Sequence, residues 1–304
     1  MTRPDGRASA RPDGRASARI AVNGVNLNVE VSGEGPPLLL LHGFSGSAAT
    51  WTPHLEAWQG FTAIAVELLG HGGSDCPADG RRYRMERCLD DLVALLDRLP
   101  ASGGRRVAVL GYSMGGRVAL RLALRAPERL WALVLESASP GIEDASERAA
   151  RARSDDDLAD DIERDGLEVF VERWQALPLF ASQSRLPVAV RDELRRQRLQ
   201  NDPRGLAGSL RALGAGRQEP VLARMDELRI PVLLLTGVLD DKYCALARRM
   251  AAALPCARTE VVPDAGHAVH LERPQAFAGA IRGFLEECLP AGRQVCREND
   301  GGRV

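Results

Sequence analysis

The sequence of 304 residues has almost no net charge, no long apolar run and no close pair of cysteines. Its 40 Lys and Arg residues balance 41 Asp and Glu residues, which gives a formal net charge of −1. This balance provides no basic field for nucleic acid or an anionic membrane, so we expect neither as a partner. No stretch has the pattern of a signal peptide or the length and apolarity of a membrane span.

The six cysteines are scattered, without the CxxC pairs or Cys/His clusters that zinc sites use. Their spacing also gives no disulfide framework, so we expect reduced thiols, a cytoplasmic protein and no metal. The cysteines are Cys76, Cys88, Cys244, Cys256, Cys288 and Cys296.

The octamer RPDGRASA occupies residues 3–10 and recurs unchanged at residues 11–18. Two copies of a polar octamer cannot build a repeat fold, and they have no apolar face to bury. We therefore expect residues 1–18 to be a disordered tail, with an interaction arm as the alternative. The polar residues 291–304 should form a second tail.

Short apolar runs alternate with helical patterns between the two tails. Runs such as PPLLLLHG, RRVAVLGYS and IPVLLLTG end in turn residues, as buried parallel strands do, and the alternation around Asn23-Gly24 predicts a hairpin. Residues 141–218 contain only charged amphipathic stretches. The pattern predicts an α/β fold with a mostly parallel central sheet, helices on both faces, and a helical lid at 141–218 between core segments 19–140 and 219–290.

Ser113 lies in the motif Gly-Tyr-Ser-Met-Gly, residues 111–115, directly after the apolar run VAVL and before the helical pattern RVALRLALRA. This context is that of a nucleophile elbow, in which the glycines allow a tight turn and the helix N-terminus favours negative charge. The alternative is an ordinary glycine-rich turn. We interpret Ser113 as a catalytic residue.

The segment His42-Gly43-Phe44 ends another early apolar run. In folds with a nucleophile elbow, this loop supplies a backbone N–H to an oxyanion hole, so we expect Phe44 and Met114 to donate theirs. We interpret His42 itself as a structural turn residue.

Asp240 and His267 each follow a late apolar strand pattern. The chain order Ser113, Asp240, His267 is that of α/β-hydrolase triads. Two neighbours compete with them: Asp241, which should begin the next helix, and His270, which should be a packed or exposed residue at a helix start. We favour Asp240 and His267.

Arg117 follows Ser113 by four residues, so the two side chains share a helix face. Burying an unpaired guanidinium is unfavourable, whereas a carboxylate satisfies its planar fork. We therefore expect Arg117 to bind a substrate carboxylate.

Residues 19–288 resemble the α/β-hydrolase family and, within it, the 2-succinyl-6-hydroxy-2,4-cyclohexadiene-1-carboxylate synthases of menaquinone biosynthesis. The family commonly has a proline at the position of Leu69 and an aspartate at that of Glu67; we expect these departures to affect only the local turn. The resemblance rests on LHGFSGSAATW, LGHGGSD, GYSMGGRVAL, ESASPGI, ERAARARSD, FVERWQALPLFASQ, GVLDDKYC and AGHAVH.

The resemblance implies a lyase that eliminates pyruvate from a small polycarboxylate, with the triad acting as a base and with no metal or organic cofactor. It also places Arg151, Arg198 and Trp174 at the site beside Arg117. The residues alone leave other interpretations open: two solvated arginines and a tryptophan in the core of the lid. Tyr112 could either donate a hydrogen bond from its hydroxyl or pack.

Two other functions remain open. A carboxylesterase or C–C bond hydrolase would use the same triad for attack by water and would have a mainly apolar pocket, which Arg117 argues against. A non-catalytic ligand receptor would bind without turnover. The sequence is compatible with a monomer or a small homo-oligomer.

Overall fold

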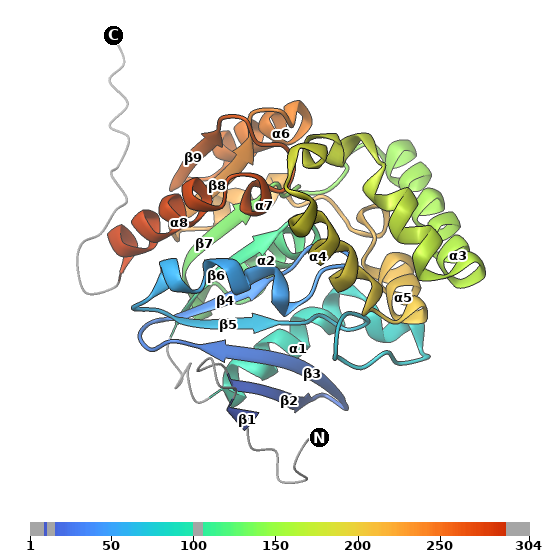
Figure 1. Ribbon diagram of the computed structural model, residues 1–304. Coiled ribbons are helices and arrows are strands. Elements are labelled where there is room, and N and C mark those ends of the chain that lie inside the picture. Colours follow the sequence, from blue (N-terminus) through green and yellow to red (C-terminus); the bar gives the residue numbers. More distant parts are fainter. Residues whose placement is uncertain (1–8, 11–15, 100–105, 290–304) are drawn as a thin grey trace.

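A nine-stranded sheet forms the centre of the computed structural model, which describes residues 9–10, 16–99 and 106–289 (Figure 1). The strand order is β1-β2-β3-β5-β4-β6-β7-β8-β9. The neighbours from β5 to β9 pair in parallel, while β1, β2, β3 and β5 pair antiparallel. The strands are β1 (Ser9–Ala10), β2 (Ala16–Val22), β3 (Val25–Ser32), β4 (Pro37–Leu41), β5 (Thr62–Val66), β6 (Val107–Tyr112), β7 (Leu130–Glu136), β8 (Val232–Gly237) and β9 (Ala257–Val262).

Helices cover both faces of this sheet, as predicted. Leu39 and Leu41 of β4 belong to one core cluster and Leu38 and Leu40 to another, because successive strand residues point to opposite faces. The first cluster includes residues of α1 (Met85–Arg98), α2 (Met114–Arg125) and α6 (Asp241–Ala253). The second includes residues of α8 (Pro274–Cys288) and the 3-10 helix η1 (Ala48–His54).

The predicted hairpin connects β2 to β3, with Val22 paired to Val25. Asn23 and Gly24 both have positive φ, 44° and 85°, as a tight hairpin turn requires. The expected disordered tail is wrong at residues 9–10 and 16–18, because β1 pairs with the start of β2. Backbone pairing along a sheet edge needs no apolar side chains, so composition did not reveal it. The rest of the octamer repeat and the tail at 291–304 lie outside the described residues.

A helical insertion, residues 141–218, separates β7 from β8. It contains α3 (Ala145–Gln175), the 3-10 helix η5 (Pro178–Arg185), α4 (Val188–Leu199) and α5 (Pro203–Leu213), which Figure 1 shows gathered to one side of the sheet, away from α8. The insertion has its own apolar cluster, to which α3 and α5 contribute Ile162, Phe170 and Leu206. α3 is broken at Gly166, whose φ of 84° is non-helical.

Within the described residues, no helix is long and apolar enough to cross a membrane. The expectation of reduced thiols is wrong for Cys256, which is disulfide-bonded. Its partner lies outside the described residues. The free cysteines are Cys76, Cys88, Cys244 and Cys288.

Candidate active site

Ser113 occupies a strained turn between β6 and α2. Its φ of 51° and ψ of −106° lie outside the usual regions for a residue with a side chain. A Cβ on Gly111 would come within 2.4 Å of the Gly115 carbonyl oxygen, and one on Gly115 within 2.2 Å of the Leu41 carbonyl oxygen. The glycines are therefore required for the turn that presents the Ser113 hydroxyl.

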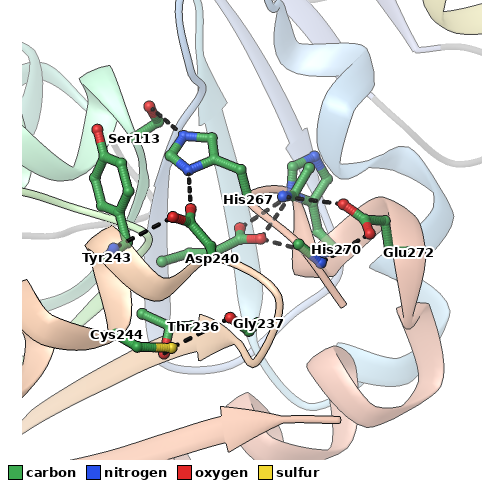
Figure 2. Close-up of polar contacts among 12 residues, drawn as sticks. Ser113, Thr236, Gly237, Asp240, Tyr243, Cys244, His267, His270 and Glu272 are labelled. Atoms are coloured by element: carbon green, nitrogen blue, oxygen red, sulfur yellow. Dashed lines mark hydrogen bonds and ion pairs between the residues drawn. The ribbon is translucent and has the colours of Figure 1, made fainter. Parts of the chain in front are cut away.

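His267 lies between Ser113 and Asp240 (Figure 2). Its Nδ1 is 2.7 Å from Asp240 Oδ2, and its Nε2 is 3.0 Å from Ser113 Oγ. With the Nδ1 proton donated to the carboxylate, Nε2 is free to accept the serine proton. The structure thus brings the three predicted residues together in the geometry of a serine–histidine–acid triad.

Neighbouring groups hold the two partners of Ser113 in place. Asp240 caps the N-terminus of α6, where its second carboxylate oxygen accepts from the backbone N–H of Tyr243 at 3.2 Å. Glu272 accepts the backbone N–H groups of Gly266 and Ala268, on either side of His267 (Figure 2). The loop that carries Asp240 and the loop that carries His267 are therefore both held by hydrogen bonds within the protein.

The competing residues take other roles. Asp241 is the exposed first residue of α6. His270 is buried, and its Nδ1 lies 2.9 Å from a carboxylate oxygen of Glu136, which is itself fully buried. The carbonyl of Glu136 also accepts the backbone N–H of Ser113. His270 therefore belongs to the packing behind the elbow.

Phe44 and Met114, the expected oxyanion donors, line the same cavity as Ser113. His42, just before Phe44, is fully buried, and its Nε2 accepts the backbone N–H of Leu68 at 3.1 Å. Burial lowers the pKa of His42 to about 4, so its ring is neutral at neutral pH. His42 supports the loop rather than the chemistry.

Glu67, which replaces the family's aspartate, joins separate segments. Its carboxylate accepts from the backbone N–H of Ala48 at 3.0 Å, the side chain of Asn28 at 2.9 Å and the backbone N–H of Gly73 at 2.6 Å. Glu67 therefore links the turn at Gly73 to β3 and to the start of η1. Leu69 is simply buried in the core.

The triad opens into a cavity of about 480 Å³ whose walls mix aromatic, aliphatic and charged side chains. The cavity lies between the sheet and the helical insertion, because residues of both line it. Among the predicted residues, those that line it are Phe44, Tyr112, Ser113, Met114, Arg117, Arg151, Trp174 and His267.

Arg117 lines this cavity without a close ion pair, although the nearby Asp155 carboxylate acts on its charge. Its Nη1 donates to the Leu213 carbonyl oxygen at 2.9 Å, and no ion pair forms with any residue that the structure describes. Burial lowers the pKa of Arg117 to about 10, which still leaves the guanidinium charged at neutral pH. The remaining donors are available to an anion in the cavity.

Arg151 also lines the cavity, but a carboxylate already balances its charge. Its Nε lies 2.8 Å from Asp155 Oδ1, and its side chain is 44% exposed. Arg151 therefore provides a weaker attraction for an anion than Arg117 does.

Arg198 is not among the residues that line the main cavity, but its charge acts on Tyr112, which does line it. It is buried beside Phe180, with its guanidinium carbon 5.6 Å from the centre of that ring, and its Nη1 has no hydrogen-bond partner among the described residues. Burial lowers its pKa to about 10. η5 brings the Phe180 ring close to both Arg198 and His267, and the sequence does not show that packing.

Trp174 and Tyr112 both pack against other rings and also line the cavity. The ring of Trp174 packs against Phe44, with centroids 5.3 Å apart, while the residue lines the cavity. Tyr112 packs between His267 and His270, with centroid distances of 5.5 and 4.6 Å. Burial raises the pKa of Tyr112 well above its usual value, so its hydroxyl keeps its proton.

The sequence analysis missed Tyr243 and Phe180, which both line the cavity beside the triad. The ring centroid of Tyr243 is 4.5 Å from that of His267, and burial raises the pKa of its hydroxyl. Tyr243 could have been found, since the third residue after a helix N-cap lies close to the cap. Phe180 gave no such signal, because its position depends on how the insertion packs.

The described residues contain no cluster of three or more His, Cys, Asp or Glu side chains able to hold a metal ion. The candidate site comprises the triad, aromatic walls and arginines, and the expected backbone donors Phe44 and Met114 line its cavity.

Comparison with known proteins agrees with this geometry. Residues 36–274 match the family described as alpha/beta hydrolase fold. The chain belongs to this family. Its sheet order and the strand–Ser113–helix turn are the features of the family that carry the candidate site.

Two relatives carry the same name. A Bacillus subtilis (strain 168) protein, provisionally named 2-succinyl-6-hydroxy-2,4-cyclohexadiene-1-carboxylate synthase, is 43% identical over 259 residues, which cover 84% of this chain and 93% of that protein. The synthase of that name from Salmonella paratyphi C (strain RKS4594) is 32% identical over 250 residues, covering 82% and 94%.

Two solved structures are also similar. MenH from S. aureus is 32% identical with a TM-score of 0.82, over 85% of this chain and 98% of that one. A malate-bound esterase from Thermogutta terrifontis is 28% identical with a TM-score of 0.76, over 90% of this chain and 98% of that one.

Proposed function

We propose that this protein is a lyase that eliminates pyruvate from 5-enolpyruvoyl-6-hydroxy-2-succinyl-cyclohex-3-ene-1-carboxylate to give 2-succinyl-6-hydroxy-2,4-cyclohexadiene-1-carboxylate in menaquinone biosynthesis. One structural observation carries the proposal: the charged, partly buried Arg117 lines the same cavity as Ser113 and His267 and forms no ion pair with any described residue. A polycarboxylate supplies the missing negative charge. The similarity to proteins named for this reaction supports the assignment.

The triad acts as a base in this proposal. Ser113 Oγ takes the proton from ring carbon 2 while its own proton passes to His267 Nε2, and Asp240 stabilises the imidazolium. The electron pair moves through the ring to form the double bonds at positions 2 and 4, and it breaks the bond from ring carbon 5 to the enolpyruvyl oxygen. His267 then returns a proton to the departing enolate, which becomes pyruvate.

Negative charge develops on the succinyl carbonyl oxygen as the neighbouring proton leaves. We propose that the backbone N–H groups of Phe44 and Met114 receive this oxygen, since both residues line the cavity at Ser113. The N-terminus of α2, which begins at Met114, favours the same charge.

The arginines differ in their proposed contributions. Arg117 binds a carboxylate directly through its open donors, and Arg151 adds a partly compensated charge at the wall. Arg198 adds positive charge beside Phe180 and Tyr112, two residues that line the cavity. Trp174 and Tyr112 shape the cavity around the ring, and Tyr112 can also donate its hydroxyl proton.

The proposal also covers the location, the oligomeric state and the cofactor requirement expected from the sequence. The enzyme acts on a small polycarboxylate in the cytoplasm as a monomer or small homo-oligomer, and it needs no metal, organic cofactor, nucleic acid or membrane.

Carboxyl ester hydrolysis is the second candidate, favoured by the complete triad and by the similarity to the Thermogutta terrifontis esterase. Both reactions can be followed on the same preparation. The lyase should release pyruvate and form the diene, seen by its absorbance, at equal rates from the carboxylated cyclohexene. Rapid turnover of p-nitrophenyl esters without pyruvate release would support the esterase. Binding without either turnover would support a receptor.

A further inference from the structure

A buried amide of the insertion, that of Asn201, is hydrogen-bonded to the loop that follows Phe44. Asn201 lies between α4 and α5 and is only 6% exposed. Its Nδ2 donates to the carbonyl oxygens of Ser45 at 3.0 Å and Arg198 at 2.9 Å, and its Oδ1 accepts the backbone N–H of Gly72 at 3.0 Å. Ser45 and Gly72 precede Asn201 by 156 and 129 residues, so the amide joins the insertion to the loops that follow β4 and β5.

Ser45 has an unfavourable backbone conformation directly after Phe44. Its φ of 60° lies in the left-handed region that residues with a side chain rarely adopt. A backbone hydrogen bond from Gly46 to the Gly43 carbonyl oxygen, at 3.0 Å, closes the turn, but the Ser45 hydroxyl is buried without a partner among the described residues. The Asn201 amide supports this turn from outside, at the residue next to Phe44.

Gly72 belongs to a turn that contacts the ring of Phe44. The ring centroid of His71, the preceding residue, is 5.7 Å from that of Phe44, in an edge-to-face arrangement. A Cβ on Gly72 would come within 2.2 Å of Glu67 Oε2, so the turn has little room to shift. Asn201 therefore supports both the backbone after Phe44 and the turn that packs on its ring.

These contacts require an amide at position 201. An asparagine side chain has two N–H donors and a carbonyl acceptor, and all of them are used here. Aspartate would keep the acceptor for Gly72 but would lose both donors, and leucine, of similar shape, would make none of the hydrogen bonds. A buried amide with every group in use holds its partners rigidly.

We propose that Asn201 is a positioning residue for the backbone N–H of Phe44, so that the helical insertion sets one of the two oxyanion donors. This inference rests on the proposed function, in which that N–H receives the charge that develops on the substrate. Displacing such a donor weakens its hydrogen bond to a developing charge more than it weakens binding of the ground state. Loss of the Asn201 amide should therefore lower kcat rather than raise KM.

Asn201→Leu should lower kcat for elimination by about tenfold or more and change KM by less than about twofold. Asp202→Ala, at the next position, is the matched control. Asp202 caps α5 by accepting from the backbone N–H groups of Arg204 and Gly205, so its loss should lower the melting temperature by about 2–4 °C and change kcat by less than about twofold. If kcat falls no further in Asn201→Leu than in Asp202→Ala, the proposal is overturned.

Phenylboronic acid gives a readout that does not depend on elimination. The Ser113 oxygen forms a bond to boron while its proton passes to His267, and the tetrahedral anion places an oxygen at the oxyanion donors. Calorimetric titration of full-length Asn201→Leu should give a dissociation constant about tenfold or more above that of the wild type, whereas the constant for succinate, a probe of the Arg117 charge, should change by less than about twofold. Equal weakening of both ligands, or unchanged boronate binding, would contradict the positioning role.

If Asn201→Leu does not fold, Asn201→Asp makes the same test. It keeps the shape and the acceptor for Gly72 but removes the donor to Ser45, so the boronate constant should again rise by about tenfold or more. A purely electrostatic effect of the new carboxylate would weaken succinate as well and would reject the positioning role. If the Asn201 variants weaken boronate alone while the wild type releases no pyruvate, the proposed lyase function fails and the positioning role stands.

Discussion

The catalytic triad at the sheet edge and the polar residues of the helical insertion differ in how completely the protein satisfies their hydrogen bonds. Asp240 and His267 are hydrogen-bonded to each other and to their surroundings by the protein itself. Gln183 and Arg198 of the insertion have buried nitrogen atoms without a partner among the described residues. The triad therefore has its hydrogen bonds in place before any ligand binds, whereas the insertion retains open donors, as does Trp51 outside it.

Substitutions in the catalytic triad should have the largest effect on the rate of elimination. Ser113→Ala, His267→Ala and Asp240→Asn should each reduce elimination severely, on the order of 10³-fold or more, since each removes part of one proton-transfer unit. The effects should be strongly non-additive in the double variants. Steady-state kinetics with the natural substrate measures this, and near-normal activity of Ser113→Ala would reject the mechanism.

The triad at the sheet edge was also easier to predict from the sequence than the residues of the insertion. Ser113, Asp240 and His267 each follow an apolar strand, and strand ends of a parallel sheet meet at one edge, so local patterns placed them together. Arg198 and Phe180 lie in the insertion, where no sheet fixes the register. Their positions depend on helix packing, which spacing within one helix does not reveal.

The second largest effect should come from Arg117, which forms no ion pair with any described residue. Arg117→Ala should lower kcat/KM for the polycarboxylate. The loss of transition-state stabilisation should be about 2–4 kcal/mol, because the substitution removes a contact between opposite charges. Arg117→Lys should recover only part of the loss, since a point charge cannot reproduce the two-point fork. A small neutral ester, if turned over, should be affected little.

A structural role of Arg117 would show a different pattern. Its hydrogen bond to Leu213 ties α2 to the insertion, so loss of that contact alone would lower the melting temperature and reduce activity toward both substrates equally. Melting temperature and both rates, measured on the same variants, distinguish the two roles.

Acid should weaken the sheet-borne half of the molecule first. All five histidines lie outside the insertion, and burial lowers the pKa of His42 to about 4, below its unfolded value of about 6.5. The unfolded state therefore binds the proton first, and the free energy of unfolding falls as the pH drops from 6.5 towards 4. His42 alone should contribute a loss of about 2 kcal/mol between pH 8 and pH 5.

Denaturant unfolding of the wild type and His42→Gln at both pH values isolates this contribution. The glutamine amide oxygen reaches the position of Nε2 and can accept the Leu68 N–H but does not titrate, so the difference between pH 8 and pH 5 should shrink by about 2 kcal/mol. An unchanged difference would mean that His42 is not held neutral by burial.

The smallest effect should come from the arginine that the chain already neutralises. The Arg151 side chain is 44% exposed and paired with Asp155. Arg151→Gln should therefore lower kcat/KM for the polycarboxylate only slightly, with a loss of transition-state stabilisation of about 1 kcal/mol or less. Asp155→Asn, which frees the guanidinium, should lower KM rather than raise it, and the double variant should behave like Arg151→Gln. The result that would contradict this prediction is a loss of kcat/KM in Arg151→Gln as large as that in Arg117→Ala. It would mean that the Arg151–Asp155 ion pair opens when the substrate binds and that Arg151 then contacts the substrate as directly as Arg117 does.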